Sequence, residues 1–257
     1  MILLVDVDPP IATVTLNRPE SRNALSVELT EAIQSAITDL DRRDDVSAIV
    51  LTGTDPAFCA GVDLKQLATQ DRPDRVVQLA GPPAFFGPLP THDTPVIGAI
   101  NGASVTGGLE LVLACDFLIA SERATFADTH ARVGVMPGWG LTVRLPEVVG
   151  INRARQMSFT GDYVDARRAY DWGLVNEVVA HDDLLARARE VAEHVASIPS
   201  DHVREIRSIY HAVHALNGEA AWECESEWSR RWMAERFDQS RLASERERIV
   251  ERGRSQQ

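Results

Sequence analysis

The chain has 257 residues, which is enough for one large domain or for a domain with a small appendage. Hydrophobic residues make up 44% and charged residues 25%, and this composition argues against intrinsic disorder. The formal net charge is -12, from 26 Lys and Arg against 38 Asp and Glu, and an acidic surface repels a phosphate backbone. We therefore expect no nucleic-acid partner, although a local basic patch can still hold a small anionic ligand.

Strands and helices alternate through the first two thirds of the chain. Strands are predicted at residues 2–7 and 11–16, because β-branched and apolar residues fill the first and the second alternates with a period of two. Ser26 is the predicted N-cap of a helix whose apolar residues recur at helical spacing. Further strands are predicted at residues 47–51, 96–100 and 117–120, and a short apolar helix at residues 109–114. The alternation indicates an α/β fold.

The last third of the chain shows helical patterns only. We therefore predict a core at residues 1–180 and a helical C-terminal region at residues 181–257. Large apolar side chains gather on one predicted helix of this region: Trp222, Trp228, Trp232, Met233 and Phe237. They fit either packing against the α/β core or contact between subunits, since aromatic residues and Met are enriched at interface cores.

Cysteine usage and the N-terminus indicate a cytoplasmic protein. Cys59, Cys115 and Cys224 are scattered, odd in number and without CxxC spacing, so neither a disulfide framework nor a zinc site is expected. The N-terminus lacks the basic segment of a signal peptide, and no apolar stretch is long enough to span a bilayer.

Two glycine-bearing turns, at residues 58–64 and 101–110, each follow a predicted strand. A turn that leads into a helix exposes backbone N–H groups without intrahelical partners, and two such groups that converge form an oxyanion hole. Most glycines after strands are simply turn residues. Glu110 lies in the first turn of the predicted helix, where its charge either complements the helix dipole or serves general acid/base chemistry. Neither turn matches GxGxxG or the P-loop, and the chain has no GxSxG elbow.

Ordered motifs across residues 2–179 resemble the enoyl-CoA hydratase/isomerase (crotonase) family. The motifs are Asn17-Arg18-Pro19, Asn23-Ala24-Leu25, Ala57-Phe58-Cys59-Ala60-Gly61-Val62-Asp63-Leu64, Pro95-Val96-Ile97-Gly98-Ala99-Ile100-Asn101-Gly102, Gly107-Gly108-Leu109-Glu110-Leu111, Cys115-Asp116, Gly134-Val135-Met136-Pro137-Gly138-Trp139-Gly140, Thr160-Gly161 and Ala169-Tyr170-Asp171-Trp172-Gly173-Leu174-Val175-Asn176.

The resemblance implies a spiral of ββα units with a C-terminal helical trimerisation region, assembled as a homotrimer or a dimer of trimers. It implies an acyl-CoA substrate, with coenzyme A entering as part of that substrate, and neither a metal nor a redox cofactor. By motif position, the N–H groups of Ala60 and Gly107 would hold the thioester oxygen. The substrate-binding residues would be Ala60, Gly61, Val62, Asp63 and Gly107.

Two glutamates carry the acid/base chemistry in hydratases of this family. The first corresponds to Glu110, and the second corresponds to His130, which departs from the pattern. A histidine can exchange a proton near neutral pH, but a lone histidine is more often structural. Asp128 is a nearby carboxylate, although an offset of two residues changes its direction.

The resemblance therefore predicts an enoyl-CoA hydratase/isomerase-type lyase with Glu110 and His130 as catalytic residues. A single-carboxylate acyl-CoA isomerase and a non-catalytic acyl-CoA-binding protein are the alternatives. By family analogy, residues 66–90 border the acyl pocket. Their Phe85 and Phe86 fit an apolar substrate, or equally a core or hinge role.

Overall fold

The computed structural model describes residues 1–69 and 88–214, and beyond these only residues 216, 220, 223, 224, 227, 230, 231 and 235. Contacts within the chain separate two compact units, Met1–Arg204 and Glu205–Gln257. All the strands described below belong to the first unit. The predicted boundary at residue 180 falls inside that unit.

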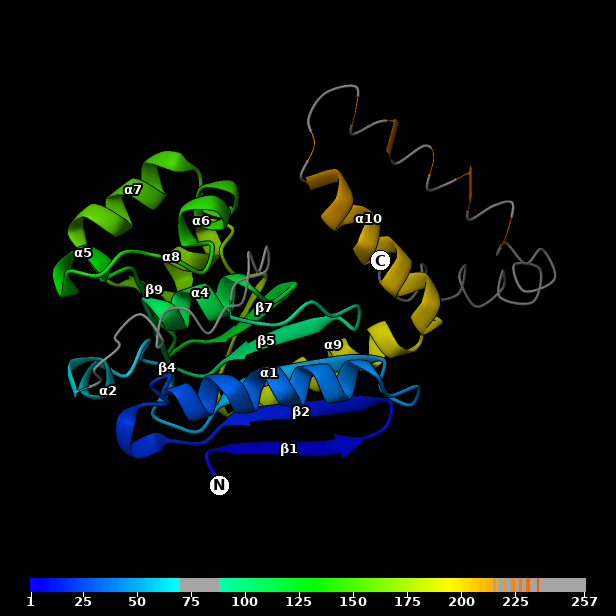
Figure 1. Ribbon diagram of the computed structural model, residues 1–257, viewed down its shortest axis with the longest axis horizontal. Helices are drawn as coiled ribbons and strands as arrows, with labels where there is room; N and C mark the ends of the chain where they lie inside the picture. Colours follow the sequence, from blue (N-terminus) through cyan, green and yellow to red (C-terminus); the bar gives the residue numbers. More distant parts are fainter. Residues whose placement is uncertain are drawn as a thin grey trace. The chain divides into compact units, whose positions relative to one another are not determined.

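The first unit is built on two β-sheets (Figure 1). The six-stranded sheet has, in spatial order, β1 (Leu3–Asp8), β2 (Ile11–Leu16), β3 (Ala48–Gly53), β5 (Val96–Ile100), β7 (Phe117–Ser121) and β10 (Glu177–Val179). The four-stranded sheet has β4 (Ala57–Cys59), β6 (Ala103–Val105), β8 (Thr125–Ala127) and β9 (Val164–Asp165). Among the strands that the structure describes, pairing is antiparallel only between β1 and β2 and between β8 and β9.

Successive strands alternate between the two sheets. The chain passes from β3 to β4, from β5 to β6 and from β7 to β8, each time leaving the larger sheet for the smaller one. A helix follows each pair: α2 (Leu64–Thr69), α4 (Gly107–Leu113) and α5 (His130–Val133). The α/β class is confirmed, and this connectivity is a repeated ββα unit.

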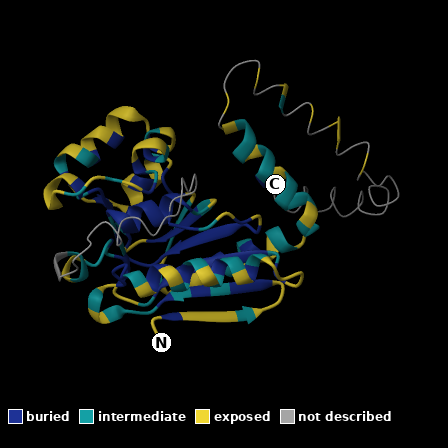
Figure 2. Ribbon diagram, viewed as in Figure 1, coloured by how far each residue is buried: buried dark blue, intermediate teal, exposed yellow. Residues whose placement is uncertain are grey.

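Helix α1 (Val27–Asp41) forms as the sequence predicts. Ser26 is its N-cap, and its hydroxyl oxygen accepts a hydrogen bond from the Leu29 N–H at 3.2 Å. The predicted apolar side chains are all buried: Leu29, Ile33, Ile37 and Leu40. They join the main core. The central strands β3, β5 and β7 of the larger sheet are largely dark blue in Figure 2, whereas β1 at its edge is largely exposed.

The remaining helices follow in chain order. They are α6 (Leu141–Val149), α7 (Ile151–Thr160), α8 (Ala166–Asp171), α9 (Leu184–Ala196) and α10 (Ser200–His214), with 3-10 turns η1 (Pro19–Ser21) and η2 (His181–Asp183). Helix α9 packs on β2, β3, β5 and β7, and its buried Leu184, Ala188 and Ala192 share a hydrophobic cluster with these strands. This packing is the reason that α9 belongs to the first unit, although its sequence reads as part of the C-terminal region.

Several residues singled out in the sequence lie outside the part of the chain that the structure describes. Phe85 and Phe86 lie outside the described residues, as do Trp222, Trp228, Trp232, Met233 and Phe237. Among the helices that the structure describes, none is long and apolar enough to cross a membrane.

Candidate active site

Three turns meet at one edge of the smaller sheet. The strands β4, β6 and β8 are neighbours and run parallel, so their carboxyl ends lie at the same edge. The turn after β4 carries residues 60–63, the turn after β6 carries Thr106 and Gly107, and the turn after β8 carries residues 128–130. The topology thereby brings together motifs that are widely separated in the sequence.

A cavity of about 70 Å³ lies at this edge. Its lining is mostly apolar, with a few polar groups: Ala60, Val62, Leu64, Leu67, Thr106, Glu110, Thr129, His130, Val133, Val135, Met136, Gly138 and Trp139. An apolar cavity with a few convergent polar and titratable groups is the usual form of a small-molecule site.

The N–H group of Ala60 already has a partner within the protein. It donates a hydrogen bond to the carbonyl oxygen of Arg22 at 3.0 Å. An N–H with a carbonyl acceptor is not free to bind a substrate oxygen, so the assignment of Ala60 as an oxyanion donor is corrected. Ala60 still lines the cavity.

The backbone nitrogens of Val62 and Gly107 lie next to each other on adjoining turns. A Cβ placed on Gly107 would lie 3.4 Å from the Val62 nitrogen, and a Cβ placed on Gly61 would lie 3.2 Å from the Gly107 nitrogen. Gly107 is the first residue of α4, so its N–H has no acceptor within the helix. Within the described residues, the Val62 N–H donates no backbone hydrogen bond, although those of Ala60 and Asp63 do. The turns after β4 and β6 therefore bring the backbone nitrogens of Val62 and Gly107 close together at this edge of the sheet.

Two glycines make this close approach possible. Gly61 has a φ of +89°, and a Cβ there would lie 2.6 Å from the carbonyl oxygen of Val105. Gly108 packs α4 against β4, since a Cβ there would lie 2.1 Å from the carbonyl oxygen of Cys59. The glycines hold the first and second turns in contact.

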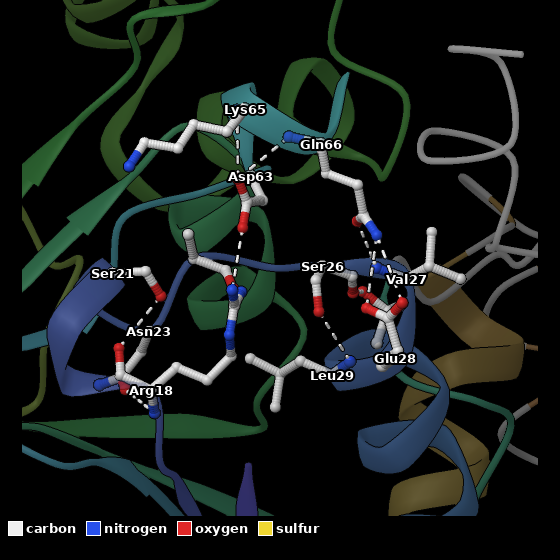
Figure 3. A network of polar contacts seen from close by, with 12 residues as sticks. Arg18, Ser21, Asn23, Ser26, Val27, Glu28, Leu29, Asp63, Lys65 and Gln66 are labelled. Carbon is white, nitrogen blue, oxygen red and sulfur yellow. Dashed lines mark hydrogen bonds and ion pairs between the residues drawn. The ribbon is translucent and has the colours of Figure 1, made fainter. Parts of the chain in front are cut away.

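Asp63 has a structural role rather than a place in the cavity lining. Its carboxylate forms an ion pair with Arg18 at 3.0 Å and accepts hydrogen bonds from the N–H groups of Lys65 and Gln66 at 3.1 and 3.3 Å (Figure 3). The last two contacts cap α2. Gln66 in turn accepts a hydrogen bond from the Val27 N–H at 2.8 Å, which ties the first turn to α1. Asp63 thus holds the turn that carries Val62.

The carboxyl group of Glu110 is buried at the cavity wall, with 3% of the residue exposed. Its Oε1 accepts hydrogen bonds from the backbone N–H groups of Trp139 at 2.8 Å and Gly138 at 3.3 Å. Burial raises the pKa of this carboxyl group, against the opposing effects of the Trp139 hydrogen bond and of His130. A charge that only complemented a helix dipole would be expected in solvent, so burial favours the acid/base role.

His130 lies opposite Glu110, and Asp128 lies behind it. The distance from His130 Nε2 to Glu110 Oε2 is 3.7 Å. On the other side of the ring, His130 Nδ1 is 2.6 Å from Asp128 Oδ1, which also accepts the His130 backbone N–H at 3.1 Å. Asp128 and His130 are both buried. The position of the expected second glutamate is therefore occupied by a buried Asp–His pair.

Several residues of the site had no predicted role. Trp139 and Gly138 fix Glu110 through their backbone N–H groups, and the glycine- and proline-rich turn at residues 134–140 was the available signal. Thr106 has a φ of 56°, a conformation that is rare for a β-branched residue and that is often found at functional sites. Its hydroxyl pairs with that of Thr129.

Cys59 precedes the first turn, but burial raises the pKa of its thiol to about 12 and keeps it protonated. Across residues 1–69 and 88–214, no group of three or more His, Cys, Asp or Glu side chains is placed to hold a metal ion.

Known proteins resemble this chain along most of its length. The family model for enoyl-CoA hydratase/isomerase matches residues 7–250. An Arabidopsis thaliana protein, named a probable peroxisomal enoyl-CoA hydratase, is 39% identical over 199 residues, which cover 77% of this chain and 74% of that protein. The crystal structure of an enoyl-CoA hydratase from Mycobacterium tuberculosis H37Rv has a TM-score of 0.77 and 49% identity, over 90% of this chain and 98% of that one. A Bacillus anthracis enoyl-CoA hydratase has a TM-score of 0.86 and 32% identity, over 92% of each chain.

Proposed function

The chain belongs to the enoyl-CoA hydratase/isomerase family, and from this premise we propose that it is an enoyl-CoA hydratase, which adds water across the carbon–carbon double bond of an acyl-CoA thioester. One observation carries the choice of a hydratase over a single-carboxylate isomerase. Two titratable side chains, Glu110 and His130, face each other at 3.7 Å beside a pair of backbone N–H groups. Water addition uses two proton-handling groups, whereas moving a double bond needs only one.

The backbone N–H groups of Val62 and Gly107 are the proposed donors to the thioester oxygen. When the water oxygen bonds to the β-carbon, the electrons of the double bond move toward the thioester carbonyl and its oxygen gains negative charge. N–H donors fixed before the reaction stabilise this charge as it develops, and one such donor contributes about 3–4 kcal/mol to the barrier reduction. The enolate-like intermediate then takes a proton at the α-carbon, and the carbonyl bond forms again.

Glu110 and His130 are the proposed acid/base pair. One group takes a proton from the attacking water and a proton is delivered to the α-carbon, so the product gains one water in total. The raised pKa of Glu110 supports this role, because a larger fraction of the carboxyl group then keeps its proton as the pH approaches neutral and can act as a general acid. The retention of a buried, fixed Glu110 also argues against the alternative of a protein that only binds acyl-CoA.

A panel of trans-2-enoyl-CoAs of increasing chain length tests the proposal, with the products identified by mass spectrometry. A hydratase gives a product heavier by one water. An isomerized product of unchanged mass would replace the hydratase with the isomerase, and binding without turnover across the panel would replace it with a binding protein. Glu110→Gln serves as the inactive control.

We also propose a homotrimer or a dimer of trimers, and a cytoplasmic location. Several large apolar side chains are exposed on the single chain, among them Val143 at 60% and Phe159 at 79%, which supports burial against another subunit. The cytoplasmic location is supported by cysteines that are free rather than paired in disulfides. No metal or redox cofactor enters this proposal, and coenzyme A is part of the substrate.

A further inference from the structure

We propose that Asp128 is a positioning residue that holds His130 in the tautomer with its hydrogen on Nδ1, so that Nε2 is the ring atom that exchanges protons opposite Glu110. The inference rests on the proposed hydratase function for its kinetic consequence, but the tautomer itself can be measured without any substrate.

The contacts of Asp128 restrict the imidazole ring in two ways. Asp128 Oδ1 accepts a hydrogen bond from the His130 backbone N–H at 3.1 Å and lies 2.6 Å from the ring atom Nδ1. One carboxylate oxygen thus fixes both the main chain and the ring of the same residue. Since Asp128 is only 1% exposed, water does not compete for this contact.

The charge state of Asp128 decides which atom donates. Burial alone would raise the pKa of this carboxyl group, but hydrogen bonds from His130 and from the Ser158 hydroxyl outweigh it, and the net effect lowers the pKa. An ionised carboxylate only accepts hydrogen bonds. His130 Nδ1 must therefore carry hydrogen, and the neutral ring must have its lone pair on Nε2.

Glu110 mirrors this arrangement from the other side. Its Oε1 is occupied by the Trp139 and Gly138 N–H groups, so Oε2 is the oxygen that faces His130 Nε2. Each of the two groups has one atom held by the protein and one atom directed to the other. Without Asp128, the ring could turn over or carry its hydrogen on Nε2, and the lone pair would no longer face Glu110.

Among the charged groups of the neighbouring helices, only Glu110 and Asp128 face His130 in the described contacts. Arg132 of α5 donates to the Thr160 carbonyl oxygen at 2.6 Å and pairs with Asp162. Arg144 of α6 donates to the Leu113 carbonyl oxygen at 2.7 Å. A change in the tautomer or in the pH profile of an Asp128 variant is therefore assignable to the contact with Asp128.

The test is nitrogen-15 NMR of protein labelled at its 7 histidines, with the His130 signals assigned by their loss in His130→Ala. In the unmodified protein above neutral pH, we expect His130 as the tautomer with hydrogen on Nδ1. In Asp128→Asn, the amide can donate to Nδ1, so we expect the population to shift toward hydrogen on Nε2. A ring that carries its hydrogen on Nε2 in the unmodified protein would overturn the inference, whether or not Asp128→Asn folds.

Kinetics on a turned-over enoyl-CoA provide the second arm. We expect Asp128→Asn to lower kcat by about 100-fold with little change in KM and to move the pH profile, because loss of an orienting carboxylate leaves a misdirected histidine. Asp171→Asn is the matched control, since it makes the same chemical change at an exposed carboxylate. A shifted tautomer with unchanged kcat and pH profile would contradict the positioning role and leave the hydratase proposal standing. Absence of turnover in the unmodified protein would instead contradict the hydratase proposal, while the NMR result would still decide the tautomer.

Discussion

Glu110 Oε2 and His130 Nε2 lie 3.7 Å apart, on the first turns of helices α4 and α5 in two neighbouring strand–turn–helix units. Both residues are buried, and each is held from behind, Glu110 by backbone N–H groups and His130 by Asp128. Charged groups this close affect each other's protonation. The pair occupies the place where the family pattern has two glutamates, so its behaviour can be tested one residue at a time.

Glu110→Gln should lower kcat by about 10²–10⁴-fold while leaving acyl-CoA affinity nearly unchanged. The amide oxygen can still accept the Trp139 and Gly138 N–H groups, so the shape of the cavity wall is kept and only proton exchange is lost. Steady-state kinetics and calorimetry with a saturated acyl-CoA measure the two effects separately. Glu122→Gln, at an exposed position, is the matched control. Full activity in Glu110→Gln would show that the chemistry lies elsewhere.

The Glu110→Gln variant should become more stable relative to the unmodified protein as the pH rises. The folded-state pKa of Glu110 is raised above its ordinary value of 4.5, so the folded protein binds this proton more tightly than the unfolded chain does. That stability is complete below pH 4.5 and is lost as pH rises through the folded-state pKa. Glu110→Gln carries no such titration, so its free energy of unfolding relative to the unmodified protein should rise over this window. Urea unfolding at several pH values measures the difference, and a difference that falls with increasing pH would contradict the raised pKa.

His130→Ala should lower kcat by about 10²-fold if His130 acts as the second acid/base group. His194→Ala, at an exposed histidine of α9, is the control and should keep full activity. An active His130→Ala enzyme, together with an inactive Glu110→Gln enzyme, would favour the single-carboxylate isomerase.

Restoring the glutamate pair requires a second change. In His130→Glu, the new carboxylate would lie beside the buried carboxylate of Asp128, and two such groups cannot both ionise without repulsion. We therefore expect the double variant His130→Glu/Asp128→Asn to hydrate a short enoyl-CoA faster than His130→Glu alone. Equal rates in the two variants, measured under the same conditions, would show that Asp128 does not influence position 130.

Backbone amide-to-ester replacement distinguishes Val62 from Ala60 as the oxyanion donor. An ester at residue 62, made with the hydroxy-acid analogue of valine, removes one N–H and should lower kcat/KM by about 10²–10³-fold. An ester at residue 60 removes the hydrogen bond to the Arg22 carbonyl, so it should cost about 1 kcal/mol of stability with little loss of activity. The opposite ranking of activities would restore Ala60 as the donor.

Gly107→Pro also removes an N–H but is a less direct test. Thr106 has a ψ of -113°, whereas the residue before a proline favours a ψ near +120 to +160°. Loss of activity in this variant would therefore combine the missing donor with a displaced turn. The ester at residue 107 avoids that displacement and should behave like the ester at residue 62.

Light scattering at micromolar concentration should give the mass of a trimer or a hexamer. The exposed apolar side chains of the single chain, including Phe159 and Val143, would be covered in such an assembly. Replacing both with serine should leave the turnover per chain measurable while it weakens the assembly. A monomeric mass for the unmodified protein would contradict the proposed trimer.

The sequence alone determined the elements and the family pattern. Local sequence signals predicted several elements correctly: the N-cap Ser26, the strands at residues 11–16 and 96–100, and the helix that begins at Gly107. They could be predicted because hydrophobic periodicity, capping side chains and glycine act over only a few residues. The position of Glu110 in its helix did not reveal a catalytic role, and only the resemblance to the family motif predicted one. The change from alternating strands and helices to helices alone led us to predict a domain boundary near residue 180. In the structure, however, α9 packs on the larger sheet and lies inside the first unit.

Only the tertiary structure decided what each group of the site can do. Whether an N–H group can bind substrate depends on whether the protein already supplies an acceptor for it. The Ala60 N–H donates to the carbonyl oxygen of Arg22, which lies far from it in the sequence. Among the described residues, the Val62 N–H donates no backbone hydrogen bond. Asp63 looked like a binding residue until its ion pair with Arg18 and its capping of α2 were seen. Asp128 lies two residues before the position of the second glutamate, so the sequence did not indicate a role for it, yet its carboxylate contacts the imidazole ring of His130. Hydrogen-bond partners and burial arise from contacts between distant segments, and these are set by how the chain folds rather than by any local pattern.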